Sequence, residues 1–68
     1  MKISARNQIK GTITALVKGA VSGEVKVDIG GGNIVSSSIT EEAIAELGLA
    51  VGDEVLVIVK ASDVMIGK

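Results

Sequence analysis

The chain has 68 residues, enough for one small domain, and it lacks His, Cys, Pro, Phe, Tyr and Trp altogether. It therefore has none of the usual nucleophile–base pairs, soft-metal ligands or aromatic stacking platforms. Its formal net charge is −1, from 7 basic and 8 acidic residues, which gives no general attraction for nucleic acid or an anionic membrane. This composition argues against an enzyme and favours a binding protein.

The apolar content is high for so short a chain. Hydrophobic residues make up 47% of the sequence, and the mean hydropathy is +0.55. Domains below about 70–80 residues usually need a disulfide, a metal or association to be stable. Since there is no Cys for a disulfide and no His or Cys for a metal, we expect a homo-oligomer whose interfaces bury the excess apolar surface. No apolar run approaches the ~18 residues of a membrane span, and no signal peptide is evident. We expect a single cytoplasmic domain over residues 1–68.

Alternating apolar residues predict strands in the first half of the chain. One strand covers 9–17, with a face made of Ile9, Gly11, Ile13, Ala15 and Val17. After a turn at 18–20, the clearest alternation covers 21–29. The Gly30-Gly31-Gly32-Asn33 run predicts a hairpin loop, where residues that tolerate positive φ are needed. A third strand follows at 34–39.

The second half predicts one helix and two more strands. Thr40 is a good N-cap, carboxylates occupy the first turn, and Gly48 ends the helix. Val55–Val59 shows no alternation, so we expect both faces to be buried, one against the core and one against a second subunit. Ser62–Ile66 is expected to form a closing strand. The predicted fold is mainly all-β: a small OB-like Greek-key barrel of about five strands with one short helix.

The segment Ser4-Ala5-Arg6-Asn7-Gln8 is the most informative polar cluster. The guanidinium of Arg6 is a planar fork of donors that stays charged and suits an oxyanion. In an extended segment, Ser4, Arg6 and Gln8 share one face and Asn7 lies on the other. The alternative is structural: Arg6 pairs with a surface carboxylate, while Asn7 and Gln8 cap a turn.

Three further polar segments are candidates for anion binding. Lys60-Ala61-Ser62 directly follows the apolar strand, so its backbone amides and side chains lie at the edge of the apolar core. The alternative is that this segment is an ordinary solvated strand end. Ser36-Ser37-Ser38 and Thr40 add hydroxyl groups near the start of the helix. The backbone amides of Lys18–Ser22 could also bind an anion, although a plain hairpin turn explains that segment equally well. The carboxylates show no metal-loop spacing, so we expect no metal held directly by protein ligands.

The first and last clusters together resemble the molbindins, the small Mop-type molybdate-binding proteins. The resemblance covers nearly the whole chain, from Ile3-Ser4-Ala5-Arg6-Asn7-Gln8-Ile9-Lys10-Gly11 to Val59-Lys60-Ala61-Ser62-Asp63-Val64-Met65-Ile66. It implies an OB-like barrel, assembled as a trimer of dimers, that stores molybdate or tungstate between subunits for molybdenum homeostasis. Because no aromatic residue could stack on a pterin, we expect no organic cofactor.

The resemblance also implies two classes of binding site. The first would be lined by one chain and completed by a neighbouring one: Ser4, Arg6, Lys60, Ala61 and Ser62, with Ser38, Ile39 and Thr40 of the neighbour. The second would lie near a three-fold axis and would combine Asn7 or Gln8 with the residues of one turn, which are Gly19, Ala20, Val21 and Ser22. The second assignment is the weaker, because turn residues form no distinctive motif.

A different class of protein is the main alternative. The stretch from Ile39-Thr40 through Leu47-Gly48-Leu49 to Val51-Gly52-Asp53-Glu54-Val55 is similar to swapped-hairpin transition-state regulators, which are dimeric DNA-binding proteins. A net charge of −1 argues against a DNA-facing surface, and that family does not explain the Ser4–Gln8 segment. A purely structural interaction module would leave Arg6 and Lys60 without a shared role.

Overall fold

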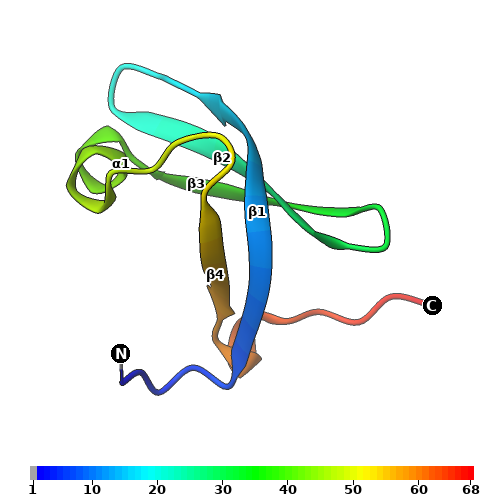
Figure 1. Cartoon of the computed structure of the whole chain (residues 1–68). Coiled ribbons are helices and arrows are strands. Elements are labelled where there is room, and N and C mark those ends of the chain that lie inside the picture. Colours follow the sequence, from blue (N-terminus) through cyan, green and yellow to red (C-terminus); the bar gives the residue numbers. More distant parts are fainter. Residues whose placement is uncertain (1) are drawn as a thin grey trace.

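A computed structural model of the chain describes residues 2–68 and contains one antiparallel sheet (Figure 1). Its strands are β1 (Asn7–Val17), β2 (Ser22–Gly30), β3 (Asn33–Thr40) and β4 (Glu54–Val59). The helix α1 (Glu41–Leu47) lies between β3 and β4, and a short 3₁₀ helix, η1 (Ala61–Asp63), follows β4. The strand order across the sheet is β3-β2-β1-β4. None of the helices in residues 2–68 is long and apolar enough to cross a membrane.

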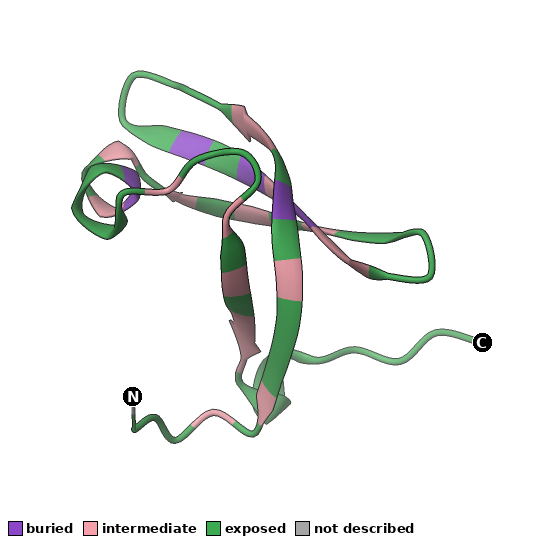
Figure 2. Cartoon of the chain, in the orientation of Figure 1, coloured by how far each residue is buried: buried purple, intermediate pink, exposed green. Residues whose placement is uncertain are grey.

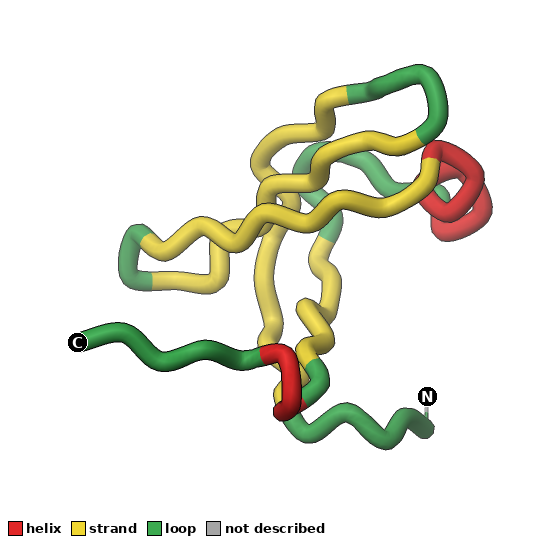
Figure 3. The backbone as a smooth tube through the Cα atoms, turned by 180° about the vertical axis from the view of Figure 1, so that it is seen from behind, coloured by secondary structure: helices red, strands yellow, loops and turns green. Residues whose placement is uncertain are grey.

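The long strand β1 joins the two halves of the sheet. Its first part pairs with β4, from Asn7 opposite Val59 to Thr12 opposite Glu54. From Thr12 onwards it pairs with β2, and the register shifts between Ile13 and Ala15. A bulge of this kind bends a strand and increases its twist. The sheet consequently curls (Figures 1 and 3), and Val55 and Val57 of β4 pack against the core cluster that contains Val25 and Val27 of β2.

The bulge also corrects one sequence prediction. Simple alternation assigns Ala15 and Val17 to the same face as Ile13. Beyond the bulge the alternation changes phase, so Leu16 packs against the core, while Val17 is 58% exposed. A single inserted residue exchanges the two faces of a strand, and the apolar pattern carried no sign of it.

The buried core is small and lies at the end of the sheet nearest α1 (Figure 2). It consists of Ile13, Val25, Val27 and Ile44. The predicted inward face of β2 is confirmed, since Val25 and Val27 are both 3% exposed. Packing of Ile44 against these strands holds a seven-residue helix that would be unstable alone.

Both ends of the predicted helix are confirmed. The Oγ1 atom of Thr40 accepts a hydrogen bond of 3.1 Å from the backbone N–H of Ala43. Gly48 adopts the left-handed conformation with φ of 63°, and its N–H donates to the carbonyl oxygen of Ala45. The Gly30–Gly32 hairpin is also confirmed, because all three glycines have positive φ.

The outer side of β4 is expected to meet a second subunit; within residues 2–68 of this one chain it is open, with Leu56 41% exposed, so that expectation stays a prediction. Another expectation about the C-terminal half is wrong. Residues 62–66 form no strand: η1 occupies 61–63, and an irregular tail follows it. The inner strand β1 is already paired on both sides, so it offers this segment no free edge. The mainly β, OB-like prediction itself is confirmed, with four strands.

Candidate functional site

The register between β1 and β4 brings two polar segments together. Asn7 pairs with Val59 at the end of the ladder. The preceding residues, Ser4–Arg6, and the following ones, Lys60–Ser62, therefore leave the sheet at the same end. Figures 1 and 3 show this end beside η1, where the N-terminal segment and the exit of β4 meet. Five of the sequence-predicted site residues are thus collected within one chain.

Two side chains of the N-terminal segment hold this arrangement in place. The Nδ2 atom of Asn7 donates a hydrogen bond of 3.1 Å to the carbonyl oxygen of Val59. The Nε2 atom of Gln8 donates one of 3.3 Å to the carbonyl oxygen of Ala5. Asn7 and Gln8 therefore have structural partners, although Asn7 bonds to the opposite strand and does not cap a turn.

Among residues 2–68, the cationic side chains at this end form no ion pair. Arg6 and Lys60 are both exposed, and they are the next residues along β1 and β4 beyond the Asn7–Val59 pair. Within residues 2–68 the ion pair that forms is elsewhere, between Lys26 Nζ and Glu24 Oε1 at 2.6 Å. The described residues therefore give no support to the alternative in which Arg6 pairs with a surface carboxylate. Two positive charges remain available to an anion at this end of the sheet.

The short helix η1 adds backbone donors beside these charges. Its internal hydrogen bonds run from Asp63 N–H to Lys60 O at 2.8 Å and from Val64 N–H to Ala61 O at 3.3 Å. The first amides of a helix have no partner inside that helix. Over the part of the chain that the structure describes, the amides of Ala61 and Ser62 donate to no other protein group. Charges, amides and the Ser62 hydroxyl thus form a donor-rich surface that suits an oxyanion.

The remaining candidates gather at the opposite end of β1. Ser22 pairs with Thr40, and Glu24 pairs with Ser38, so Ser38–Thr40 lies beside the Gly19–Ser22 turn. Figure 1 shows this turn at the far end of β1 from the N-terminus. Within one chain, the turn does not meet Asn7 or Gln8, and Ser38–Thr40 does not meet Arg6. The structure therefore sorts the candidates into two groups, at the two ends of β1.

Comparison with known proteins identifies the family. The model of the TOBE domain matches residues 3–66. The chain belongs to the TOBE domain family. A relative from Haemophilus influenzae, named a probable molybdenum-pterin-binding protein, is 51% identical over 67 residues, which are 98% of this chain and 97% of the relative. The resemblance to the Mop-type proteins is confirmed, whereas the transition-state regulators are a different family.

Two solved structures share the fold of this TOBE domain. A molybdate-binding protein from Sporomusa ovata has a TM-score of 0.93 and 37% identity, with both chains covered completely. The cytoplasmic molybdate-binding protein ModG, in a form with molybdate bound, has a TM-score of 0.90 and 42% identity. That match covers 96% of this chain and 46% of ModG. Such relatives are named as binding proteins rather than as enzymes.

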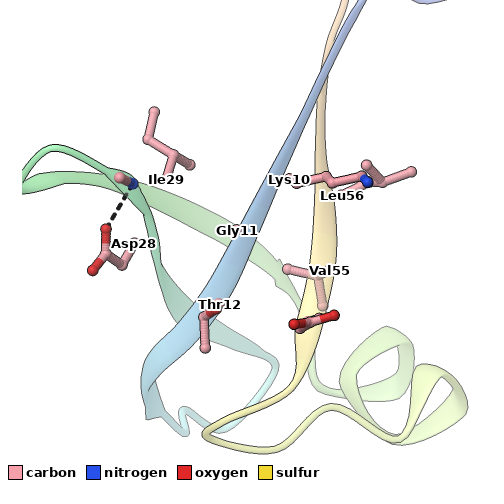
Figure 4. A pocket seen from close by; sticks show the side chains of 9 residues that line it. Lys10, Gly11, Thr12, Asp28, Ile29, Val55 and Leu56 are labelled. Atoms are coloured by element: carbon pink, nitrogen blue, oxygen red, sulfur yellow. Dashed lines mark hydrogen bonds between the residues drawn. The ribbon is translucent and has the colours of Figure 1, made fainter.

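Sequence reasoning missed a hollow of about 700 Å³ on the sheet of this TOBE domain (Figure 4). Its charged lining residues are Lys10, Asp28 and Glu54, around the bare backbone of Gly11. The Asp28 carboxylate accepts a hydrogen bond of 2.8 Å from the N–H of Gly30. With acidic groups in excess, this hollow suits an oxyanion less well than the Arg6–Lys60 end.

A second hollow, of about 580 Å³, is an apolar cleft between β4 and the rest of the sheet. Its apolar lining includes Val27, Ile39, Val55 and Val57. The sequence signal for it is the uninterrupted apolar run of β4, which predicted more burial than one chain provides. The C-terminal tail also exposes large apolar residues, with Met65 92% and Ile66 90% exposed.

Proposed function

We propose that this TOBE domain binds and stores molybdate or tungstate at subunit interfaces of a homo-oligomer, for intracellular molybdenum homeostasis. The relatives support the ligand: the Sporomusa ovata protein is a molybdate-binding protein, and ModG has been solved with molybdate bound. The composition supports a binding role without catalysis, because the chain has no His or Cys to act as base or nucleophile.

The single observation that carries the proposal is the unpaired charge of Arg6 and Lys60 at one end of the β1–β4 ladder. Molybdate is a tetrahedral dianion, so it needs convergent donors and positive charge. Arg6 would donate from its guanidinium, Lys60 from its ammonium group, and Ser4 and Ser62 from their hydroxyls. The free amides of Ala61 and Ser62 would complete the donor set of this chain. Donors around a charged ligand are worth about 1.5–3 kcal/mol each.

A neighbouring copy would complete each site. Ser38, Ile39 and Thr40 lie at the other end of β1, so in our proposal they reach this ligand only from another chain. The same reasoning applies to the second class of site, whose residues are assigned less firmly because they form no distinctive motif. There, the Gly19–Ser22 turn of one chain would meet Asn7 or Gln8 of another. Asn7 would contribute without its Nδ2 atom, which already donates to Val59.

Self-association is supported by the apolar surface that one chain leaves open. The tail exposes Val64, Met65 and Ile66, and the cleft beside β4 is lined mainly by apolar side chains. We infer that a second copy covers these surfaces, and the family resemblance favours a trimer of dimers. Burial at such an interface would also exclude water from the oxyanion, which strengthens every charged contact.

The same proposal includes a cytoplasmic location and no binding of nucleic acid or membrane. ModG is described as cytoplasmic, and the net charge of −1 gives no general attraction for polyanions. The names of several relatives mention a pterin. We propose oxyanion binding alone, because this chain has no aromatic side chain to stack on a pterin ring. Retention on heparin at low salt would contradict the proposal on nucleic acid.

The first experiment is calorimetric titration of the purified protein with molybdate, repeated with tungstate and in a large excess of sulfate. Saturable binding that survives sulfate is expected. Arg6→Ala and Lys60→Ala should each weaken binding at the first class of site by more than tenfold, because each removes charge-assisted hydrogen bonds. Arg6→Lys tests whether the forked guanidinium matters beyond its charge.

Lys10→Ala is the matched control, since Lys10 is an exposed cation of β1 that lines the same hollow as Asp28 and Glu54. It should bind molybdate as the unmodified protein does. Absence of binding in the unmodified protein, or equal losses in Lys10→Ala and Arg6→Ala, would overturn the assignment of the site.

A further inference from the structure

Glu41, the first residue of α1, bridges back to the turn between β1 and β2. Its Oε2 atom accepts a hydrogen bond of 3.1 Å from the backbone N–H of Gly19. Its own backbone N–H donates a hydrogen bond of 2.8 Å to the carbonyl oxygen of Val21. One residue therefore holds the turn at two points, with its backbone and with its carboxylate.

The carboxylate of Glu41 is packed against the sheet. A Cβ atom added to Gly23 of β2 would lie only 2.5 Å from Glu41 Oε2 and 2.7 Å from the Cδ1 atom of Ile44. The missing side chain of Gly23 thus leaves the space that the carboxylate uses. Glu41 is half-buried, whereas its neighbour Glu42 is exposed. The sheet and the turn together fix the position of this charge.

Within residues 2–68, Glu41 forms no ion pair with a cation. In the part of the chain that the structure describes, the ion pair is between Lys26 and Glu24, and Glu41 makes none. The carboxylate that sits on the turn therefore remains a net negative charge. It occupies the Gly19 amide and repels any second anion that approaches the same donors.

We propose that Glu41 is an internal competitor for oxyanions at the Gly19–Ser22 turn. Its carboxylate takes the place of one oxygen of an external oxyanion, so an oxyanion binds there only by displacing it. This competition lowers the affinity of the second class of site for an external oxyanion. This inference rests on the proposed function, since it concerns the affinity of the second class of molybdate site.

Glu41→Gln is the decisive variant, because the amide oxygen can still accept from Gly19 while the negative charge is lost. Glu42→Gln makes the same change of net charge one residue away and is the matched control. In calorimetric titration with molybdate, Glu41→Gln should strengthen binding at the second class of site by about tenfold, or reveal it if it is not seen in the unmodified protein. Glu42→Gln should change it by less than about twofold.

Several outcomes separate the two proposals. If the unmodified protein binds no molybdate, the proposed function fails, and this inference fails with it. If the unmodified protein binds and Glu41→Gln leaves binding at the second class of site unchanged or removes it, only the present inference is overturned. Should Glu41→Gln fail to fold, the unmodified protein still provides a test through the amide resonance of Gly19. Titration with molybdate should move that resonance as the second class of site fills, and an unmoved resonance at saturation would contradict the competition.

Discussion

The side-chain amide of Asn7 donates a hydrogen bond of 3.1 Å to the carbonyl oxygen of Val59, across the last pair of the β1–β4 ladder. This contact lies one residue from both Arg6 and Lys60. It fixes the point at which the two strands separate, and so the relative positions of the two cations. Asn7 is therefore a structural residue of the candidate site, because its Nδ2 atom holds the two strands together.

Asn7→Ala should lower the free energy of unfolding by about 1 kcal/mol, the usual worth of one hydrogen bond. It should also weaken molybdate binding, because Arg6 and Lys60 are held less firmly. Asn33→Ala is the control: Asn33 Nδ2 donates a hydrogen bond of 3.1 Å to Gly30 O in the β2–β3 hairpin, away from the site. Chemical denaturation and calorimetry measure both quantities. Equal losses of affinity in the two variants would contradict the role given to Asn7.

Gly23→Ala should destabilise the domain by about 1–3 kcal/mol, because the new methyl group overlaps the Glu41 carboxylate and Ile44. The strain should be relieved partly by moving Glu41 away from the turn. Gly67→Ala is the control, since a Cβ there meets nothing within 4 Å. Thermal unfolding of the two variants measures the difference. Equal unfolding midpoints for Gly23→Ala and Gly67→Ala would show that Glu41 and Ile44 do not pack closely over Gly23.

Thr40→Ala should cost about 0.5–2 kcal/mol, because the amide of Ala43 loses its capping oxygen. Thr40→Ser keeps that oxygen and should be nearly neutral in stability. Circular dichroism during denaturation gives the comparison. A serine variant as unstable as the alanine variant would mean that the methyl group, rather than the cap, stabilises this end of α1.

Replacing Met65 and Ile66 together by serine should reduce self-association, because these are the most exposed large apolar side chains of the tail. Val51→Ser, at an exposed apolar residue of the turn before β4, is the control. Sedimentation velocity reports the oligomeric state of each protein. An unchanged oligomer in the double variant would remove the tail from the proposed interface.

Sequence reasoning recovered the local elements, because their causes are local. Alternation along 21–29 reflects one covered face of a strand, and Thr40 and Gly48 end the helix by hydrogen bonds to near neighbours. It failed at the bulge near Thr14 and at residues 62–66. In both places the outcome depends on the register and free edges of partner strands, which are distant in the sequence.

The sequence by itself determined which residues could bind an anion, because that depends on side-chain chemistry: a guanidinium, an ammonium group, hydroxyls, and no aromatic or imidazole ring. Only the tertiary structure decided which of them lie together. The pairing of Asn7 with Val59 joins Arg6 to Lys60, although 53 positions separate them in the 68-residue chain. The length of β1 separates both cations from Ser38–Thr40 and from the turn that Glu41 occupies. The physical reason is that strand register is a long-range property, set by backbone hydrogen bonds and burial across the whole sheet.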